Sequence, residues 1–290
     1  MANTTSPPAI AGLAAIAPAY RALLCDVWGV VHNGLTAFAP ACEALARFRR
    51  DHGPVVLITN APRPASAVRR QLTEIGVEPS AYDDIVTSGD VTRQLLVAWG
   101  SARVFNVGPE RDRRLYDGLQ LQFVGEEEAE VISCTGLFDD DSETPEDYED
   151  RLRRWAGRGL TMVCANPDIV VERGDKLIYC AGALARRYGE LGGRTLIAGK
   201  PHEPIYQKAI ERVSSLAGRK LDSSEILAIG DGLATDSAGA QGQGIDALFI
   251  AGGIHFGQWA GGEAPLATEV SALLQSQRLG ARAFMQRLSW

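Results

Sequence analysis

The stretch Leu23–Gly34, LLCDVWGVVHNG, decides the fold of this chain. The apolar run Leu23-Leu24-Cys25 leads to a single carboxylate, Asp26, and the run resumes at Val30-Val31 after a glycine. In α/β proteins, a buried strand that delivers a lone Asp before a glycine-containing loop places a nucleophile or metal ligand at the carboxyl edge of the sheet. We therefore expect the first strand over 23–31 and a functional role for Asp26.

Apolar runs of strand length alternate with segments of helical apolar spacing on both sides of this stretch. Strands are expected over 55–58, 85–88, 195–198, 226–229 and 247–250, and helices over 40–50, 65–75, 90–99, 204–216 and 234–241. The β-α-β-α order implies parallel strands with right-handed crossovers. The expected fold class is α/β, with a Rossmann-type core built on a doubly wound parallel sheet.

The regular alternation of expected strands and helices changes between residues 90 and 190. Short strand candidates over 103–107, 121–124, 131–134 and 160–164 are separated by acidic or glycine-containing loops, with helices expected over 145–156 and 181–190. We expect an inserted α/β module, residues 89–191, inside a core formed by residues 1–88 and 192–290. The C-terminal segment 266–288 is expected to form one or two surface helices.

Composition narrows the range of partners. The 290 residues carry a formal net charge of −7, which argues against nucleic acid as the main partner. Apolar runs stay short of the ~20 residues that a membrane span needs. The five cysteines are odd in number and lack metal-binding spacing, which favours reduced thiols and a cytoplasmic protein.

Polar residues follow four of the expected core strands. They are Asp26; Thr59 and Asn60; Lys200; and Asp231 with Asp236. Several carboxylates suit a hard cation such as Mg²⁺, and an ammonium, a hydroxyl and backbone N–H groups suit a phosphate beside it. The pattern indicates phosphoryl chemistry, in which an Asp attacks phosphorus, Mg²⁺ offsets charge and Lys200 orients both.

These motifs, in this order, resemble the haloacid dehalogenase superfamily, and more narrowly its NagD-type branch (subfamily IIA), whose members carry a large inserted α/β cap. The DxDG motif of that family is represented by Asp26-Val27-Trp28-Gly29, and the strand ending in Thr/Ser-Asn by Leu57-Ile58-Thr59-Asn60. The Gly-Lys-Pro motif is Gly199-Lys200-Pro201, and GDxxxTD is Gly230–Asp236. Asn166-Pro167-Asp168 also matches an Asn-x-Asp turn near the end of the cap.

The resemblance implies a Mg²⁺-dependent phosphatase that acts on a small phosphorylated metabolite through an aspartyl-phosphate. Asp26 would be the nucleophile and a metal ligand, together with the backbone carbonyl of Trp28, Asp231 and Asp236. Lys200 would act in catalysis and, with Thr59 and Asn60, bind the phosphoryl group. For Asn166 and Asp168 two roles stay open: they form a turn, or they face the substrate.

Trp28 departs from the family pattern, in which this position is an Asp that protonates the leaving group. An indole has no usable acid–base chemistry, and losing a general acid typically removes about 10²–10⁴ of rate. Three interpretations stay open: a slow phosphatase, an acid supplied by His32, His202 or the substrate, or a degenerate protein that binds a phosphorylated ligand without turnover. The substrate's identity and a homodimeric state also stay open.

Overall fold

The computed structural model describes residues 6–173, 176–254 and 265–290. It divides into two compact units, Met1–Thr59 with Val68–Val86 and Tyr206–Trp290, and Asn60–Ala67 with Thr87–Ile205. None of the helices in the described ranges combines the length and hydropathy that a bilayer crossing requires. All five cysteines are buried and reduced.

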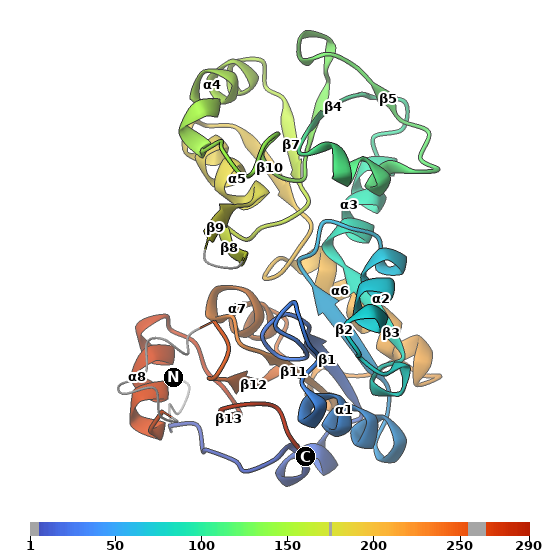
Figure 1. The fold of residues 1–290 in the computed structure, drawn as a ribbon, viewed down its shortest axis with the longest axis vertical. Helices are drawn as coiled ribbons and strands as arrows, with labels where there is room; N and C mark the ends of the chain where they lie inside the picture. Colours follow the sequence, from blue (N-terminus) through green and yellow to red (C-terminus); the bar gives the residue numbers. More distant parts are fainter. Residues whose placement is uncertain (1–5, 174–175, 255–264) are drawn as a thin grey trace. The chain divides into compact units, whose positions relative to one another are not determined.

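The first unit is built on a six-stranded sheet in the order β13-β12-β11-β1-β2-β3 (Figure 1). Its strands are β1 (Ala22–Asp26), β2 (Val55–Thr59), β3 (Asp84–Thr87), β11 (Ile226–Gly230), β12 (Asp246–Ile250) and β13 (Ala283–Met285). The helices that lie in this unit for all or most of their length are α1 (Ala39–Asp51), α2 (Ala65–Glu74), α6 (Glu203–Leu216), α7 (Ala238–Gly242) and α8 (Ala267–Ser276). The pairs from β13 to β2 are parallel, which confirms the expected α/β class with a Rossmann-type sheet.

The second unit has its own parallel sheet, in the order β10-β7-β6-β4-β5. Its strands are β4 (Arg103–Val107), β5 (Gln122–Phe123), β6 (Val131–Cys134), β7 (Thr161–Cys164) and β10 (Arg194–Ile197). Its helices are α3 (Ser88–Val97), α4 (Glu149–Gly157) and α5 (Ala181–Glu190), and β8 (Val170–Arg173) pairs with β9 (Lys176–Tyr179) in an antiparallel hairpin that we did not expect.

Alternate side chains of this second sheet enter two different cores. In β6, Val131 packs in a cluster with Leu96 of α3, whereas its neighbour Ile132 packs in another with Trp155 of α4 and Leu184 of α5. Successive strand residues point to opposite faces, so helices bury both faces of the sheet.

The first strand is shorter than the sequence suggested. It ends at Asp26, and Val30 and Val31 belong to a tight loop in which the Val31 N–H donates to the Val27 carbonyl at 2.9 Å. Gly29 has a φ of +80°, a left-handed conformation that breaks an extended run. The expectation of a strand through Val31 was therefore wrong, although both valines are buried.

Two further expectations need correction. The strand near 195–198 was expected in the outer module, but β10 pairs with β7 in the second unit's sheet, with Leu196 opposite Val163. The C-terminal segment contains one helix, α8, and then the edge strand β13. A three-residue strand has too little periodicity to be distinguished from a helix by sequence alone.

Candidate functional site: a carboxylate cluster at the switch point of the first sheet

Asp26 and Asp231 flank the point where the first sheet reverses its strand order. From β1 the chain continues to β2 on one side, whereas β11 lies on the other side of β1 and leads to β12. Cys25 is opposite Ile229, so Asp26 at the end of β1 and Asp231 just after β11 lie at the same edge. Ligands of open α/β sheets bind at this kind of crevice.

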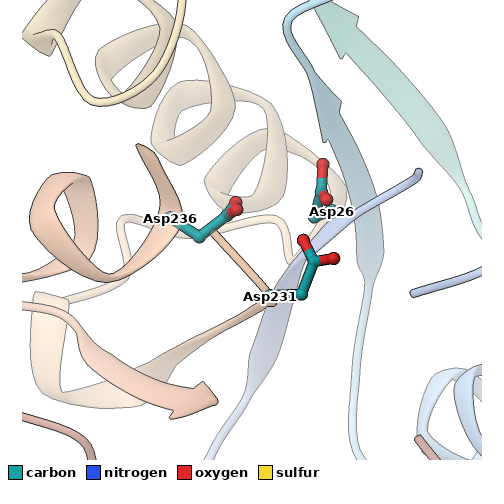
Figure 2. Close-up of side chains that lie close together, drawn as sticks. All are labelled: Asp26, Asp231 and Asp236. Carbon is teal, nitrogen blue, oxygen red and sulfur yellow. The ribbon is translucent and has the colours of Figure 1, made fainter. Parts of the chain in front are cut away.

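Asp236 joins them from the turn that follows β11. Oxygen atoms of Asp26, Asp231 and Asp236 all lie within 4.8 Å of one another, and the three side chains are only 7%, 6% and 6% exposed. Figure 2 shows the three carboxylates converging. Asp236 lies in a π-helical turn, Leu233–Ser237, instead of the regular helix that we expected over 234–241. Single π turns inside helices are frequent at functional sites.

Backbone and hydroxyl donors fix the orientation of two of the carboxylates. The Ile254 N–H donates to Asp231 Oδ2 at 2.7 Å. The Gly232 N–H and the Thr235 hydroxyl both donate to Asp236 Oδ2 at 3.2 Å. These donors hold one oxygen of each carboxyl in place, which is how supporting groups orient metal ligands.

Three glycines make room for these carboxylates. A Cβ at Gly29 or at Gly253 would overlap Asp231 Oδ2, and a Cβ at Gly230 would overlap the carboxyl carbon of Asp236. The backbone approaches the acidic side chains at these positions so closely that only glycine fits. Gly29 therefore has two roles, because it also turns the chain away from β1.

The donor set fits a hard divalent cation. Three carboxylates that approach so closely in a buried place repel one another when ionised, and a cation between them removes that cost. Oxygen ligands without nitrogen or sulfur favour Mg²⁺ or Ca²⁺ over transition metals.

Trp28 packs against its own loop. Its ring meets that of His32 edge-on, with centroids 5.2 Å apart, and fills the place of a side chain at Gly34. The indole is still 51% exposed. His32 is buried and its Nδ1 accepts the Gly34 N–H at 2.8 Å, so that nitrogen carries no proton. This ring supports the loop rather than offering an acid.

In the second unit, Asn60 brings Lys200 and Asp168 together. Its Oδ1 accepts the Lys200 N–H at 2.7 Å, and its Nδ2 donates to Asp168 Oδ1 at 2.9 Å and to the Lys200 carbonyl at 3.3 Å. The Asp168 N–H in turn donates to Asn166 Oδ1 at 3.1 Å. Asn60, Asn166 and Lys200 are all buried. Four residues singled out in the sequence thus form one polar network within this unit.

Thr59 belongs to the first unit, as the last residue of β2. Asp26 is opposite Ile58, so Thr59 lies one residue beyond the level of Asp26 on the neighbouring strand. Its side chain is buried.

Comparisons with known proteins agree with these motifs. A family model described as haloacid dehalogenase-like hydrolase matches residues 23–122, and a second, described as HAD-hydrolase-like, matches 197–273. A solved hydrolase of the haloacid dehalogenase-like family from Brucella suis 1330 is 50% identical and superposes with a TM-score of 0.84, covering 96% of this chain and 98% of that one. The protein belongs to the haloacid dehalogenase-like hydrolases.

Two curated proteins and a further solved structure are also similar to this chain. The chain is 26% identical to 5'-nucleotidase YutF of Bacillus subtilis, over 81% of this chain and 88% of that protein. It is 27% identical to D-glycerol 3-phosphate phosphatase of Mycobacterium tuberculosis, over 83% of this chain but 65% of that protein. A solved putative nagD protein shares the fold, at 23% identity and a TM-score of 0.62, covering 81% of this chain and 90% of that one. The expectation of a haloacid dehalogenase-like hydrolase is confirmed.

Sequence reasoning missed the supports of the cluster. Gly253 and Ile254 follow β12, and the Gly252-Gly253 pair after that apolar strand was a usable signal for another strand end at the site. Thr235 lies inside a motif that the sequence analysis identified, but its hydrogen bond to Asp236 was not expected. Both residues lie in a π turn, and no sequence pattern predicted that turn.

Proposed function

We propose that the protein is a Mg²⁺-dependent phosphatase that hydrolyses a small phosphorylated metabolite through an aspartyl-phosphate on Asp26. The cluster of Asp26, Asp231 and Asp236 carries this proposal, because three buried carboxylates within 4.8 Å of one another suit a divalent cation between them. The printed names of the relatives, a 5'-nucleotidase and a glycerol 3-phosphate phosphatase, support the substrate class.

Asp26, Asp231 and Asp236, with the backbone carbonyl of Trp28, would hold Mg²⁺. When bound, the cation would neutralise charge on the phosphoryl oxygens and allow the anionic Asp26 to approach them. Gly29 and the donors to Asp231 and Asp236 keep the carboxylates in place for this role.

The reaction needs one nucleophile and one set of phosphoryl donors. An Asp26 oxygen would form a bond to phosphorus while the bond to the leaving-group oxygen breaks, and water would then hydrolyse the acyl phosphate. Lys200, Thr59 and Asn60 would bind the phosphoryl oxygens, with Asn60 also positioning Lys200 through the 2.7 Å contact to its N–H. Residues 89–191 would act as a cap that selects the substrate over the core of 1–88 and 192–290, with Asn166 and Asp168 facing it.

Turnover would be slow with poor leaving groups. Trp28 cannot protonate a leaving oxygen, and His32 Nδ1 is already an acceptor. Desolvation lowers the pKa of His202 from its usual 6.5, so less of this ring carries the proton that a general acid must donate. Substrates whose leaving group needs no proton would react best.

Trp28 also supports a second candidate, a protein that binds a phosphorylated ligand without turnover. The half-exposed indole offers a flat apolar surface where the family has an acid. Ligand binding with no phosphate release at any leaving-group pKa would favour this alternative.

Phosphate release from a panel of alkyl, aryl and acyl phosphates, with Mg²⁺ and with EDTA, tests the proposal. We expect Mg²⁺-dependent release, fastest from acetyl phosphate and 4-nitrophenyl phosphate. No release from any member of the panel would refute hydrolysis. Buried, reduced cysteines support a cytoplasmic location. Sedimentation of the purified protein shows whether it is a monomer or a homodimer.

A further inference from the structure

The turn that carries Asp236 combines two hydrogen-bond patterns. The Gly232 carbonyl accepts the Asp236 N–H at 2.9 Å and the Ser237 N–H at 3.0 Å. The first bond spans four residues, as in an α-helix, and the second spans five, as in a π-helix. Because one carbonyl accepts both bonds, the backbone of the turn does not by itself select one pattern. Contacts from other elements therefore help to decide how Asp236 is oriented.

Leu233 fixes the start of the turn. It is 5% exposed and belongs to an apolar cluster with Phe249 of β12 and Val270 of α8. This packing holds the first residue of the turn against the sheet. Asp236 comes three residues later, so the end of the turn needs a support of its own.

Tyr206 of α6 supplies that support. Its hydroxyl donates to the carbonyl oxygens of Thr235 and Asp236, at 3.4 and 3.2 Å. Two acceptors share one hydrogen, which accounts for distances longer than that of a single O–H···O bond. The two carbonyls belong to the peptide groups before and after the Cα of Asp236. The hydroxyl therefore holds the backbone on both sides of this residue.

The ring of Tyr206 is itself held in a fixed place. The side chain is 1% exposed, and Ala209 and Val213 further along α6 are fully buried on the same face of the helix. A Cβ at Gly239 of α7 would overlap the Tyr206 ring, so the ring packs directly on the backbone of α7. This packing delivers the hydroxyl to one position at the end of the π turn.

Other groups hold the Asp236 carboxylate, and their effect is different. The Gly232 N–H and the Thr235 hydroxyl, which donate to Asp236 Oδ2, both belong to the same local segment of chain. They orient the carboxyl relative to the turn, whereas Tyr206 places the turn itself. A displaced turn would carry the carboxylate out of the cluster, whose oxygens lie within 4.8 Å of one another.

We infer that Tyr206 is a positioning residue for the metal site, and that it raises the affinity for Mg²⁺ by holding the backbone of Asp236. This inference rests on the proposed binding of Mg²⁺ at the cluster. It extends that proposal by naming a residue outside the four motifs that fixes one of the ligands. Removing a group that supports a metal ligand typically weakens metal binding about 10–100-fold. Tyr206 supports the backbone of its ligand, so we expect the lower end of this range.

Tyr206→Phe tests the inference, because it removes the hydroxyl and keeps the ring. Tyr188→Phe is the matched control: Tyr188 is fully buried in the core of the second unit, and its hydroxyl donates to the Leu160 carbonyl at 2.6 Å. Each variant loses a buried hydroxyl donor to a backbone carbonyl, so both should unfold at a lower urea concentration than the wild type. In calorimetric titrations of the full-length protein, only Tyr206→Phe should bind Mg²⁺ about tenfold more weakly.

Hydrogen exchange in EDTA gives a second measurement, which needs neither metal nor turnover. The amides of Asp236 and Ser237 should exchange faster in Tyr206→Phe than in the wild type, because the turn loses its support. Tyr188→Phe should leave their exchange unchanged.

A second pair of variants moves the ring and keeps the hydroxyl. Gly239 and Gly242 both lie in α7, but a Cβ at Gly242 would meet nothing within 4 Å. Ala is favoured over Gly in helices, so Gly242→Ala should fold and bind Mg²⁺ as the wild type does. Gly239→Ala should displace the Tyr206 ring and weaken Mg²⁺ binding.

Two outcomes of these experiments would contradict the inference in different ways. Equal Mg²⁺ affinities of Tyr206→Phe and Tyr188→Phe would overturn the role of Tyr206 and leave the metal site standing. No Mg²⁺ binding by the wild type would refute the metal site and the inference together.

Discussion

Trp28 is the residue on which we expect the catalytic rate to depend. We expect Trp28→Asp to raise kcat for an alkyl phosphate by about 10²–10⁴, because it restores a general acid beside the nucleophile. The gain with 4-nitrophenyl phosphate should be much smaller, since nitrophenolate leaves without a proton. Initial rates of phosphate release with both substrates make this comparison.

Trp28→Phe is the control for this change. It removes the indole and its packing on His32 without adding an acid, so its rate with alkyl phosphates should stay near that of the wild type. If Trp28→Asp gives no gain with an alkyl phosphate, the missing acid is not what limits the enzyme.

Asp112 makes the stability of the folded protein depend on pH. Because burial raises the pKa of its carboxyl in the folded protein, the folded state holds this proton more tightly than the unfolded state does. Stability therefore falls as pH rises from the ordinary Asp value of 3.8 through the folded pKa, and the deficit persists above it. Asp112→Asn should unfold at a higher urea concentration than the wild type at pH 7, with a smaller difference at pH 4.

An unchanged or lower urea midpoint for Asp112→Asn at pH 7 would show that the buried carboxyl does not destabilise the folded protein. Asp117→Asn serves as the control, because this exposed position, just after the turn that contains Asp112, should give the wild-type midpoint at both pH values.

At the scale of elements, the loop after β1 positions the cluster. Gly29 and Gly76 both have left-handed φ angles, +80° and +88°, but only at Gly29 would a Cβ meet Asp231. Either change to Ala should cost more than about 1 kcal/mol of stability. Only Gly29→Ala should also weaken Mg²⁺ binding, by about 10–100-fold, because it displaces a ligand. Calorimetric Mg²⁺ titrations of both variants make the comparison, and equal affinities would contradict this role of Gly29.

The elements also show how far sequence can go. The ends of β1, β2 and β11 could be predicted because each is an apolar run followed by polar residues, and parallel strands bring such ends to one edge. Which of the two sheets contains β10 could not be predicted, because short strands on either side of a domain boundary have the same local pattern. The π turn that carries Asp236 depends on tertiary packing and has no local pattern either.

For the whole molecule, we expect stability to depend on a cation bound at the cluster. Mg²⁺ at 100 times its dissociation constant should stabilise the first unit by about 2.7 kcal/mol. Without Mg²⁺, repulsion among the three carboxylates remains, so Asp231→Asn should melt at or above the wild type in EDTA and below it in Mg²⁺. Calorimetric scans of both proteins in the two buffers test this crossover. A wild-type melting temperature that is the same with and without Mg²⁺ would argue against the metal site.

The most direct test of the account is the chemical state of Asp26 during turnover. Acid-quenched protein, after reaction with acetyl phosphate and Mg²⁺, can be digested and examined by mass spectrometry. We predict that the peptide containing Asp26 gains the mass of one phosphoryl group, and that neither EDTA-treated protein nor Asp26→Asn does. Phosphate release by Asp26→Asn at the wild-type rate, or a phosphoryl group carried by another residue, would contradict the assignment of Asp26 as the nucleophile.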